Sequence, residues 1–122
     1  MTRDDVARWL DRYSAAWRSY DRDEIRSLFS ANAEYRYHPW DEPVRGADAI
    51  ADDWLESPDA PGTYEGRYAP YAVEGNRAVA LGTSDYAAQG DQPARRYHNA
   101  FFLELDDAGA CRSFTELYIE QR

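Results

Sequence analysis

The first twenty residues carry apolar and aromatic side chains with the period of an α-helix. These positions recur three or four residues apart, which predicts one buried stripe on a helix of about five turns. The stripe consists of Val6, Trp9, Leu10, Tyr13, Ala16, Trp17 and Tyr20. Thr2 and Asp5 have the spacing of a capping box, so we expect the helix to begin directly after Thr2.

Two shorter helices are predicted to follow. Asp21 and Glu24 have the spacing of a second cap. The apolar residues of the short helix behind this cap are Ile25, Leu28 and Phe29. A third helix is expected after Gly46, and its apolar positions are Ala47, Ile50, Ala51 and Trp54. Prolines and a glycine end this helix, and we expect the loop 56–63 to form a lid.

Beyond residue 63 the pattern has the period of β-strands. Long strands are predicted over 64–73, 77–87, 95–105 and 111–120, after a short strand over 33–38. Short turns that contain glycine separate the long strands, which predicts an antiparallel meander. Three helices and a short strand before such a meander predict an α+β fold, with the helices packed on one face of a strongly curved, mostly antiparallel sheet.

Length, charge and cysteine content limit the classes of function. The 122 residues predict a single domain, 1–122. Fourteen arginines, no lysine and 23 acidic residues give a net charge of −9, which argues against nucleic acids and anionic membranes as partners. The single cysteine, Cys111, and an N-terminus without an apolar stretch favour the cytoplasm.

The chain lacks the common cofactor motifs. Its two histidines, His38 and His98, do not have metal-ligand spacing, and no glycine-rich phosphate or dinucleotide motif occurs. We therefore expect no metal and no cofactor.

Several short segments resemble a known family. They are 20–25, 28–35, 38–46, 97–99 and 114–118. Their order resembles the nuclear transport factor 2-like superfamily, and within it the SnoaL-like proteins. The resemblance implies a cystatin-like cone or barrel around a mostly apolar cavity, and a homodimer formed through the outer sheet face. Ketosteroid isomerase, limonene epoxide hydrolase, scytalone dehydratase and polyketide cyclases share this fold with proteins of no known reaction, so the fold does not decide the function.

The resemblance suggests two catalytic candidates. Tyr13 corresponds to a tyrosine that donates a hydrogen bond to the substrate oxygen in the isomerases, and its alternative role is core packing. His38 precedes Pro39 near the position of the isomerase general base, although strand alternation places it opposite Tyr35 and Tyr37. Phe101 stands where the isomerases carry a protonated aspartic acid, which argues against ketosteroid isomerisation itself.

Two further catalytic candidates come from strand alternation. Asn99 shares a face with apolar residues, so its amide must bond either to protein or to a ligand. Glu116 alternates with Phe114 and Tyr118. If that face points inward, burial raises the pKa of the carboxyl group and suits it to acid/base work. Otherwise Glu116 pairs with an arginine or points to solvent, and alternation does not decide between these readings.

Aromatic side chains are the candidates for ligand contacts, with core packing as the alternative. They are Trp17, Tyr35, Tyr37, Trp40, Trp54, Phe101 and Tyr118. We therefore expect a protein that binds a small hydrophobic or aromatic molecule, and interpret it as a cofactor-free isomerase, cyclase, dehydratase or epoxide hydrolase. The alternative is a non-catalytic module for ligand binding or dimerisation. Outward residues such as Phe102 and Ile119 favour a homodimer.

Overall fold

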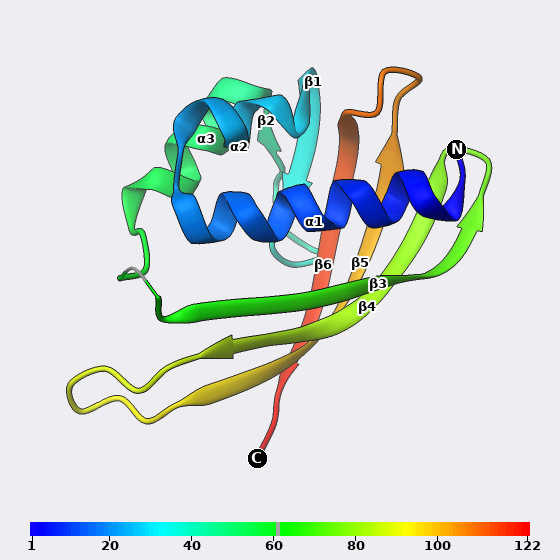
Figure 1. Ribbon diagram of the computed structural model, residues 1–122. Coiled ribbons are helices and arrows are strands. Elements are labelled where there is room, and N and C mark those ends of the chain that lie inside the picture. The colour runs from blue at the N-terminus through cyan, green and yellow to red at the C-terminus, as the bar shows by residue number, and fades with distance from the viewer. Residues whose placement is uncertain (61) are drawn as a thin grey trace.

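A computed structural model describes residues 1–60 and 62–122, in which three helices cover one face of a six-stranded sheet (Figure 1). The elements are α1 (Arg3–Ser19), α2 (Arg22–Ser27), β1 (Phe29–Arg36), β2 (Val44–Arg45), α3 (Ala47–Glu56), β3 (Tyr64–Glu74), β4 (Arg77–Tyr86), β5 (Arg95–Leu105) and β6 (Cys111–Glu120). The strand order is β2-β1-β6-β5-β4-β3, with β1 and β6 parallel and the other pairs antiparallel. The predicted α+β class is confirmed.

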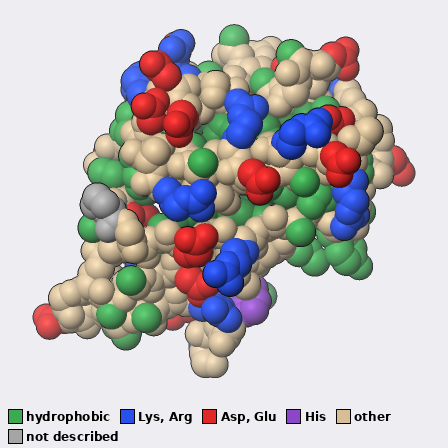
Figure 2. Space-filling view, viewed as in Figure 1, with side chains coloured by type: hydrophobic (Ala, Val, Ile, Leu, Met, Phe, Trp, Pro, Cys, Tyr) green, Lys and Arg blue, Asp and Glu red, His purple; other side chains and the backbone are tan. Residues whose placement is uncertain are grey.

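Both predicted helix caps are present. The Thr2 hydroxyl accepts a hydrogen bond from the backbone N–H of Asp5, and the Asp5 carboxylate accepts one from the backbone N–H of Thr2. Asp21 accepts from the backbone N–H of Glu24 at 3.0 Å and so caps α2. These side chains satisfy N–H groups that the first helical turn leaves without a partner. On the face of the molecule that carries α1, acidic and basic side chains are interspersed (Figure 2).

The first strand differs from the prediction. Phe29 begins β1 instead of ending the second helix, and β1 ends at Arg36. The pairing of β1 with β6 shifts register between Phe29 and Glu34, which interrupts the alternation that the sequence pattern relies on. The two-residue strand β2, which pairs with Glu34 and Tyr35, was not predicted because it is too short to produce a pattern.

The sheet curves but does not close. Within the described residues, β2 and β3 are its edges, so the cone or barrel expected from the resemblance is an open sheet completed by helices. A glycine permits the close packing of β3 against β4. A Cβ atom on Gly82 would lie 2.0 Å from the carbonyl oxygen of Arg67 and 2.6 Å from the Tyr68 ring, so no larger residue fits between these strands.

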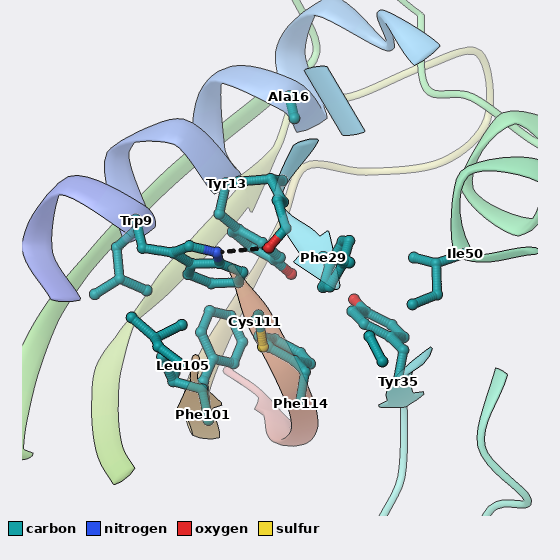
Figure 3. Packing of buried hydrophobic residues seen from close by; sticks show 14 of the residues in the cluster. Trp9, Tyr13, Ala16, Phe29, Tyr35, Ile50, Phe101, Leu105, Cys111 and Phe114 are labelled. Atoms are coloured by element: carbon teal, nitrogen blue, oxygen red, sulfur yellow. Dashed lines mark hydrogen bonds between the residues drawn. The ribbon is translucent and has the colours of Figure 1, made fainter. Parts of the chain in front are cut away.

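Stacked aromatic rings fill the space between α1 and the middle of the sheet (Figure 3). Tyr35 stacks on Phe114 with ring centroids 4.7 Å apart, and the indole N–H of Trp9 donates to the carbonyl of Leu28 at 3.0 Å. Burial raises the pKa of Cys111 to about 12, so its thiol is a packing group. This core supports the floor of the cavity described next.

Candidate functional site

A cavity of about 350 Å³ opens between the end of α1, the loop after α3 and the inner faces of β3 to β6. Its wall combines aromatic rings with hydroxyl, amide and charged groups. The lining residues are Tyr13, Trp17, Tyr20, Tyr37, Ser57, Asp59, Tyr64, Tyr68, Ser84, Tyr86, Arg95, Tyr97, Asn99, Glu116 and Tyr118. The ring faces can hold a flat apolar molecule, and the polar ends can orient it.

Glu116 points into this cavity, which resolves the ambiguity that alternation left open. Phe114 is fully buried on the inner face of β6, whereas Leu117 and Ile119 are exposed on the outer face. Burial raises the pKa of Glu116 to about 7, although the Asn99 hydrogen bond and the charge of a protonated His38 act in the opposite direction. Near neutral pH, both protonation states of this carboxyl group are therefore populated.

Asn99 holds the Glu116 carboxyl group in place. Its side-chain N–H donates to Glu116 Oε1 at 2.7 Å, and its carbonyl oxygen accepts from the Ser84 hydroxyl at 2.9 Å. The predicted alternatives for Asn99 were a bond to protein or a bond to ligand. Both of these hydrogen bonds go to protein, and the second N–H of the amide has no hydrogen-bond partner within residues 1–60 and 62–122.

The hydrogen bonds extend from Ser84 to Tyr68 and from Tyr68 to Tyr64. The chemistry of the groups determines which oxygen donates in each bond. The amide oxygen of Asn99 only accepts, so Ser84 donates to it. Tyr68 must then donate to Ser84 at 2.6 Å, and Tyr64 to Tyr68 at 2.6 Å. Both tyrosine hydrogens are used within the wall, which leaves the Tyr64 oxygen as an acceptor. Burial raises the pKa of Tyr68 to about 12 and keeps it protonated.

The helices supply the opposite wall. Tyr13 is buried on α1, and this burial raises the pKa of its hydroxyl well above 10. Trp17, one turn later, stacks on Trp54 of α3 with ring centroids 4.1 Å apart. Tyr37 follows β1 and donates to the Asp53 carboxylate. Tyr13 therefore brings a neutral hydroxyl group to the same cavity as Glu116.

His38 lies at the edge of the cavity, on the outer side. Its ring nitrogens contact Asp41 Oδ2 at 2.9 Å and the Tyr118 hydroxyl at 3.0 Å. Trp40 stacks on the imidazole with centroids 4.9 Å apart, and 80% of Trp40 is exposed. Both residues line a groove on the outer sheet face. His38 therefore reaches the cavity through Tyr118.

The structure brings most predicted site residues together, and places others elsewhere. The cavity wall contains Tyr13, Trp17, Tyr37, Asn99, Glu116 and Tyr118. Tyr35, Trp54 and Phe101 belong to the buried core, where ring packing explains their positions. Trp40, another candidate for ligand contact, lies over the outer groove.

Sequence reasoning missed several residues of the wall. They are Tyr20, Ser57, Asp59, Tyr64, Tyr68, Ser84, Arg95 and Tyr97. Strand alternation could have identified Tyr64, Tyr68 and Ser84, because they share the inner faces of β3 and β4. Asp59 was not predictable, because its place depends on the path of the loop, where it accepts from the Tyr20 hydroxyl at 3.0 Å. Pro61, within the predicted lid, lies outside the described residues.

Arg95 adds a positive charge to the wall. Its guanidinium group lies over the rings of Tyr86 and Tyr97, with centroid distances of 5.1 and 6.0 Å.

Among the residues that the structure describes, no cluster of three or more potential metal ligands is found. In the same residues, no helix is long and apolar enough to cross a membrane.

Comparisons with known proteins agree on the fold. A family model described as a SnoaL-like domain matches residues 10–112. Delta 5-3-ketosteroid isomerase from Mycobacterium sp. has 14% identity and a TM-score of 0.70, and the match covers 96% of this chain and 98% of that chain. An epoxide hydrolase/cyclase-like enzyme of pyran ring formation in polyether salinomycin has 15% identity and a TM-score of 0.74, over 93% and 89%.

A third similar structure contains a small ligand. It is a hypothetical protein with a ketosteroid isomerase-like fold from Catenulispora acidiphila, in complex with trimethylamine. It has 16% identity and a TM-score of 0.70, over 90% of this chain and 84% of that chain. At such identities the likeness establishes the fold and leaves the reaction open.

Proposed function

The chain belongs to the SnoaL-like domain family of the nuclear transport factor 2-like superfamily, and from this premise we propose that it binds a small hydrophobic or aromatic molecule and moves a proton on it. The observation that carries the proposal is Glu116, a carboxyl group with a pKa of about 7 that faces a cavity walled by aromatic rings. A base is most useful when its pKa lies near the working pH. The proposed chemistry needs no cofactor.

Glu116 is the proposed base. In its carboxylate form it takes a proton from a carbon next to a carbonyl group, and it returns the proton at another position of the ligand. The Asn99 N–H fixes one carboxyl oxygen at 2.7 Å, so Asn99 acts as a positioning residue. The neutral hydroxyl of Tyr13 is the proposed donor to the ligand oxygen, where negative charge develops.

Isomerisation, cyclisation, dehydration and epoxide opening all use such a base and donor. Phe101 is buried on the inner face of β5, at the position where the resemblance to the isomerases implies a second acid. Its apolar ring argues against ketosteroid isomerisation itself and favours another member of this group of reactions.

The second candidate function is a non-catalytic binding or dimerisation module, and the outer sheet face favours it. Exposed apolar side chains gather there, around two grooves. They are Leu81, Phe102, Leu117 and Ile119, with Trp40 beside them. A second copy of the chain is the proposed occupant, because the resemblance implies a homodimer through this face. The two functions are compatible, since Phe114 is buried on the inner face of β6, whereas Leu117 and Ile119 are exposed on its outer face.

A thermal-shift screen followed by proton exchange tests the proposal. Steroids, terpenoid epoxides, small aromatic ketones and polyketide-like compounds are added to the wild type and to Glu116→Gln. A ligand should raise the melting temperature with increasing concentration in both proteins. In D₂O, only the wild type should then exchange the acidic C–H of a bound ketone. Binding without exchange supports the non-catalytic module. A screen without any shift contradicts the catalytic proposal and the ligand-binding form of the module, whereas its dimerisation form is tested by light scattering.

A further inference from the structure

Three side chains at the edge of the cavity form a series of hydrogen bonds that is separate from the one joining Glu116, Asn99 and Ser84. Asp41 Oδ2 lies 2.9 Å from His38 Nδ1, and His38 Nε2 lies 3.0 Å from the Tyr118 hydroxyl oxygen. Tyr118 also lines the cavity, two residues after Glu116 on β6. The series therefore runs from the outer groove into the proposed site.

Chemistry fixes the direction of these hydrogen bonds when the imidazole is neutral. A carboxylate only accepts, so the imidazole hydrogen sits on Nδ1 and points to Asp41. Nε2 then carries a lone pair and accepts from the Tyr118 O–H. The Tyr118 oxygen keeps its lone pairs, with a base already bonded to its hydrogen, and the residue lines both the cavity and the outer groove. In this arrangement Tyr118 has the place of a nucleophile, His38 that of its base, and Asp41 that of the carboxylate that orients the base.

The surroundings hold the imidazole in this orientation. The backbone N–H of Asp41 donates to the carbonyl of His38 at 3.1 Å, which closes a turn between the two residues. The guanidinium N–H of Arg36 donates to the Asp41 carbonyl at 3.2 Å, and the Trp40 ring covers one face of the imidazole. Backbone and ring contacts thus restrain His38 independently of Tyr118.

We propose that Tyr118 is a second proton-transfer group of the cavity, activated by His38 with Asp41 as the positioning residue. The proposal rests on the function proposed for the cavity. As a proton leaves the ligand, the bond to the ligand breaks, its electron pair stays on the ligand, and the proton joins the Tyr118 oxygen. In the same step the Tyr118 hydrogen passes to His38 Nε2, and the imidazolium charge faces the Asp41 carboxylate. The reverse step returns a proton to the ligand.

Other cavity tyrosines have different partners. Tyr20 and Tyr37 donate to the carboxylates of Asp59 and Asp53. Tyr68 donates to Ser84. Among the described residues, Tyr118 is the tyrosine whose hydroxyl forms a hydrogen bond with an imidazole, that of His38. The neutral imidazole offers Nε2 as an acceptor, so Tyr118 combines cavity access with a base that is bonded to its hydrogen.

Labelling with benzenesulfonyl fluoride tests the activation without knowledge of the ligand. The Tyr118 oxygen attacks sulfur, an S–O bond forms as the S–F bond breaks, fluoride leaves, and His38 takes the phenol hydrogen. Tyr71 is the internal reference, because 68% of it is exposed against 44% of Tyr118. If exposure alone governs the rate, Tyr71 reacts faster. We expect peptide mass spectrometry to show Tyr118 labelled at least about tenfold faster than Tyr71.

Matched variants separate activation from structure. His38→Gln should lower the Tyr118 rate about tenfold or more and leave the Tyr71 rate unchanged, and Asp41→Asn should lower the Tyr118 rate to a smaller extent. Glu65→Gln, at an exposed carboxylate on β3, should leave both rates unchanged. The labelling requires no ligand, so its result does not depend on the outcome of the exchange experiment on Glu116. Equal rates for Tyr118 and Tyr71 in the wild type, or an unchanged Tyr118 rate in a folded His38→Gln protein, overturn the proposal.

The imidazole tautomer provides a measurement that requires no variant. A long-range ¹H–¹⁵N spectrum of the wild type should identify neutral His38 with its hydrogen on Nδ1. A neutral ring with the hydrogen on Nε2 would reverse the Tyr118 hydrogen bond and overturn the proposal.

Discussion

Asn99 on β5 and Glu116 on β6 are joined by a hydrogen bond of 2.7 Å, from the side-chain N–H of Asn99 to Glu116 Oε1. This bond stabilises the carboxylate form and lowers the pKa of Glu116 against the larger effect of burial. Asn99→Leu should therefore raise the pKa of Glu116 above 7. A carbon-detected NMR titration of the Glu116 carboxyl group measures the change.

Ser84→Ala is the matched control for this prediction. It removes the bond from Ser84 to the Asn99 carbonyl but keeps the bond to Glu116, so the pKa of Glu116 should change little. Asn99→Leu should also cost about 1–3 kcal/mol of stability, because the Ser84 hydroxyl loses its acceptor. An equal pKa in the wild type and in a folded Asn99→Leu protein would show that Asn99 does not tune the base.

Glu116→Gln should stabilise the protein in a pH-dependent way. The pKa of Glu116 is about 7 in the folded protein against an ordinary value of 4.5, so the folded state binds more protons between these values. The contribution of Glu116 to stability therefore falls as the pH rises from about 4.5 to 7. At pH 8 the charged carboxylate costs at most about 3 kcal/mol. Glutamine keeps an acceptor for Asn99 and does not titrate.

Denaturant unfolding at several pH values measures this difference. Glu116→Gln and the wild type should be equally stable near pH 4, and the variant should become the more stable protein as the pH approaches 8. Glu65→Gln is the control, because Glu65 is exposed on the outer side of β3 and pairs with Arg18 at 3.6 Å. A gap that stays constant with pH would contradict the raised pKa.

Local patterns predicted most of the fold. The caps at Thr2 and Asp21 and the bounds 95–105 and 111–120 agree with the structure, because turn and cap chemistry lie within a few neighbouring residues. The start of β1 at Phe29 was not predictable, since it depends on pairing with Cys111, far away along the chain. The open sheet likewise depends on which strands remain unpaired at the edges.

The candidate site was predictable only in part. Alternation identified Asn99 and Glu116 as candidate site residues, but it could not decide which face of β6 is inward; the structure places both in the cavity wall. That choice depends on α1, which covers the Phe114 side of the strand. The contact between His38 and Tyr118 spans 80 positions and depends on the turn around Asp41, for which no local pattern exists.

Two glycines of the sheet should respond differently to substitution by alanine. A Cβ on Gly66 would meet only side-chain atoms, 2.1 Å from the Tyr64 hydroxyl and 2.7 Å from the Tyr68 ring, whereas a Cβ on Gly82 would lie 2.0 Å from the Arg67 backbone oxygen. Gly66→Ala should therefore fold and displace the Tyr64 hydroxyl from Tyr68. Gly82→Ala must separate the backbones of β3 and β4, at a cost of about 1–3 kcal/mol or more.

Thermal unfolding compares these variants. Gly82→Ala should lower the melting temperature more than Gly66→Ala does, and Tyr64→Phe reports the effect of losing the hydroxyl alone. Equal losses for Gly66→Ala and Gly82→Ala would indicate that the backbone contact of Gly82 relaxes as readily as a side chain.

The outer sheet face should mediate dimer formation. Ile119 is 76% exposed and lies with Leu117 and Leu81 along a groove of this face. A charge there would be desolvated in a dimer, so Ile119→Glu should convert the dimer to a monomer in light scattering. Ala49→Glu adds the same charge on the exposed side of α3 and should leave the dimer intact. Because Glu116 faces the other side of the sheet, monomeric Ile119→Glu should keep any ligand-induced thermal shift. A wild type that scatters as a monomer at high concentration would contradict this prediction.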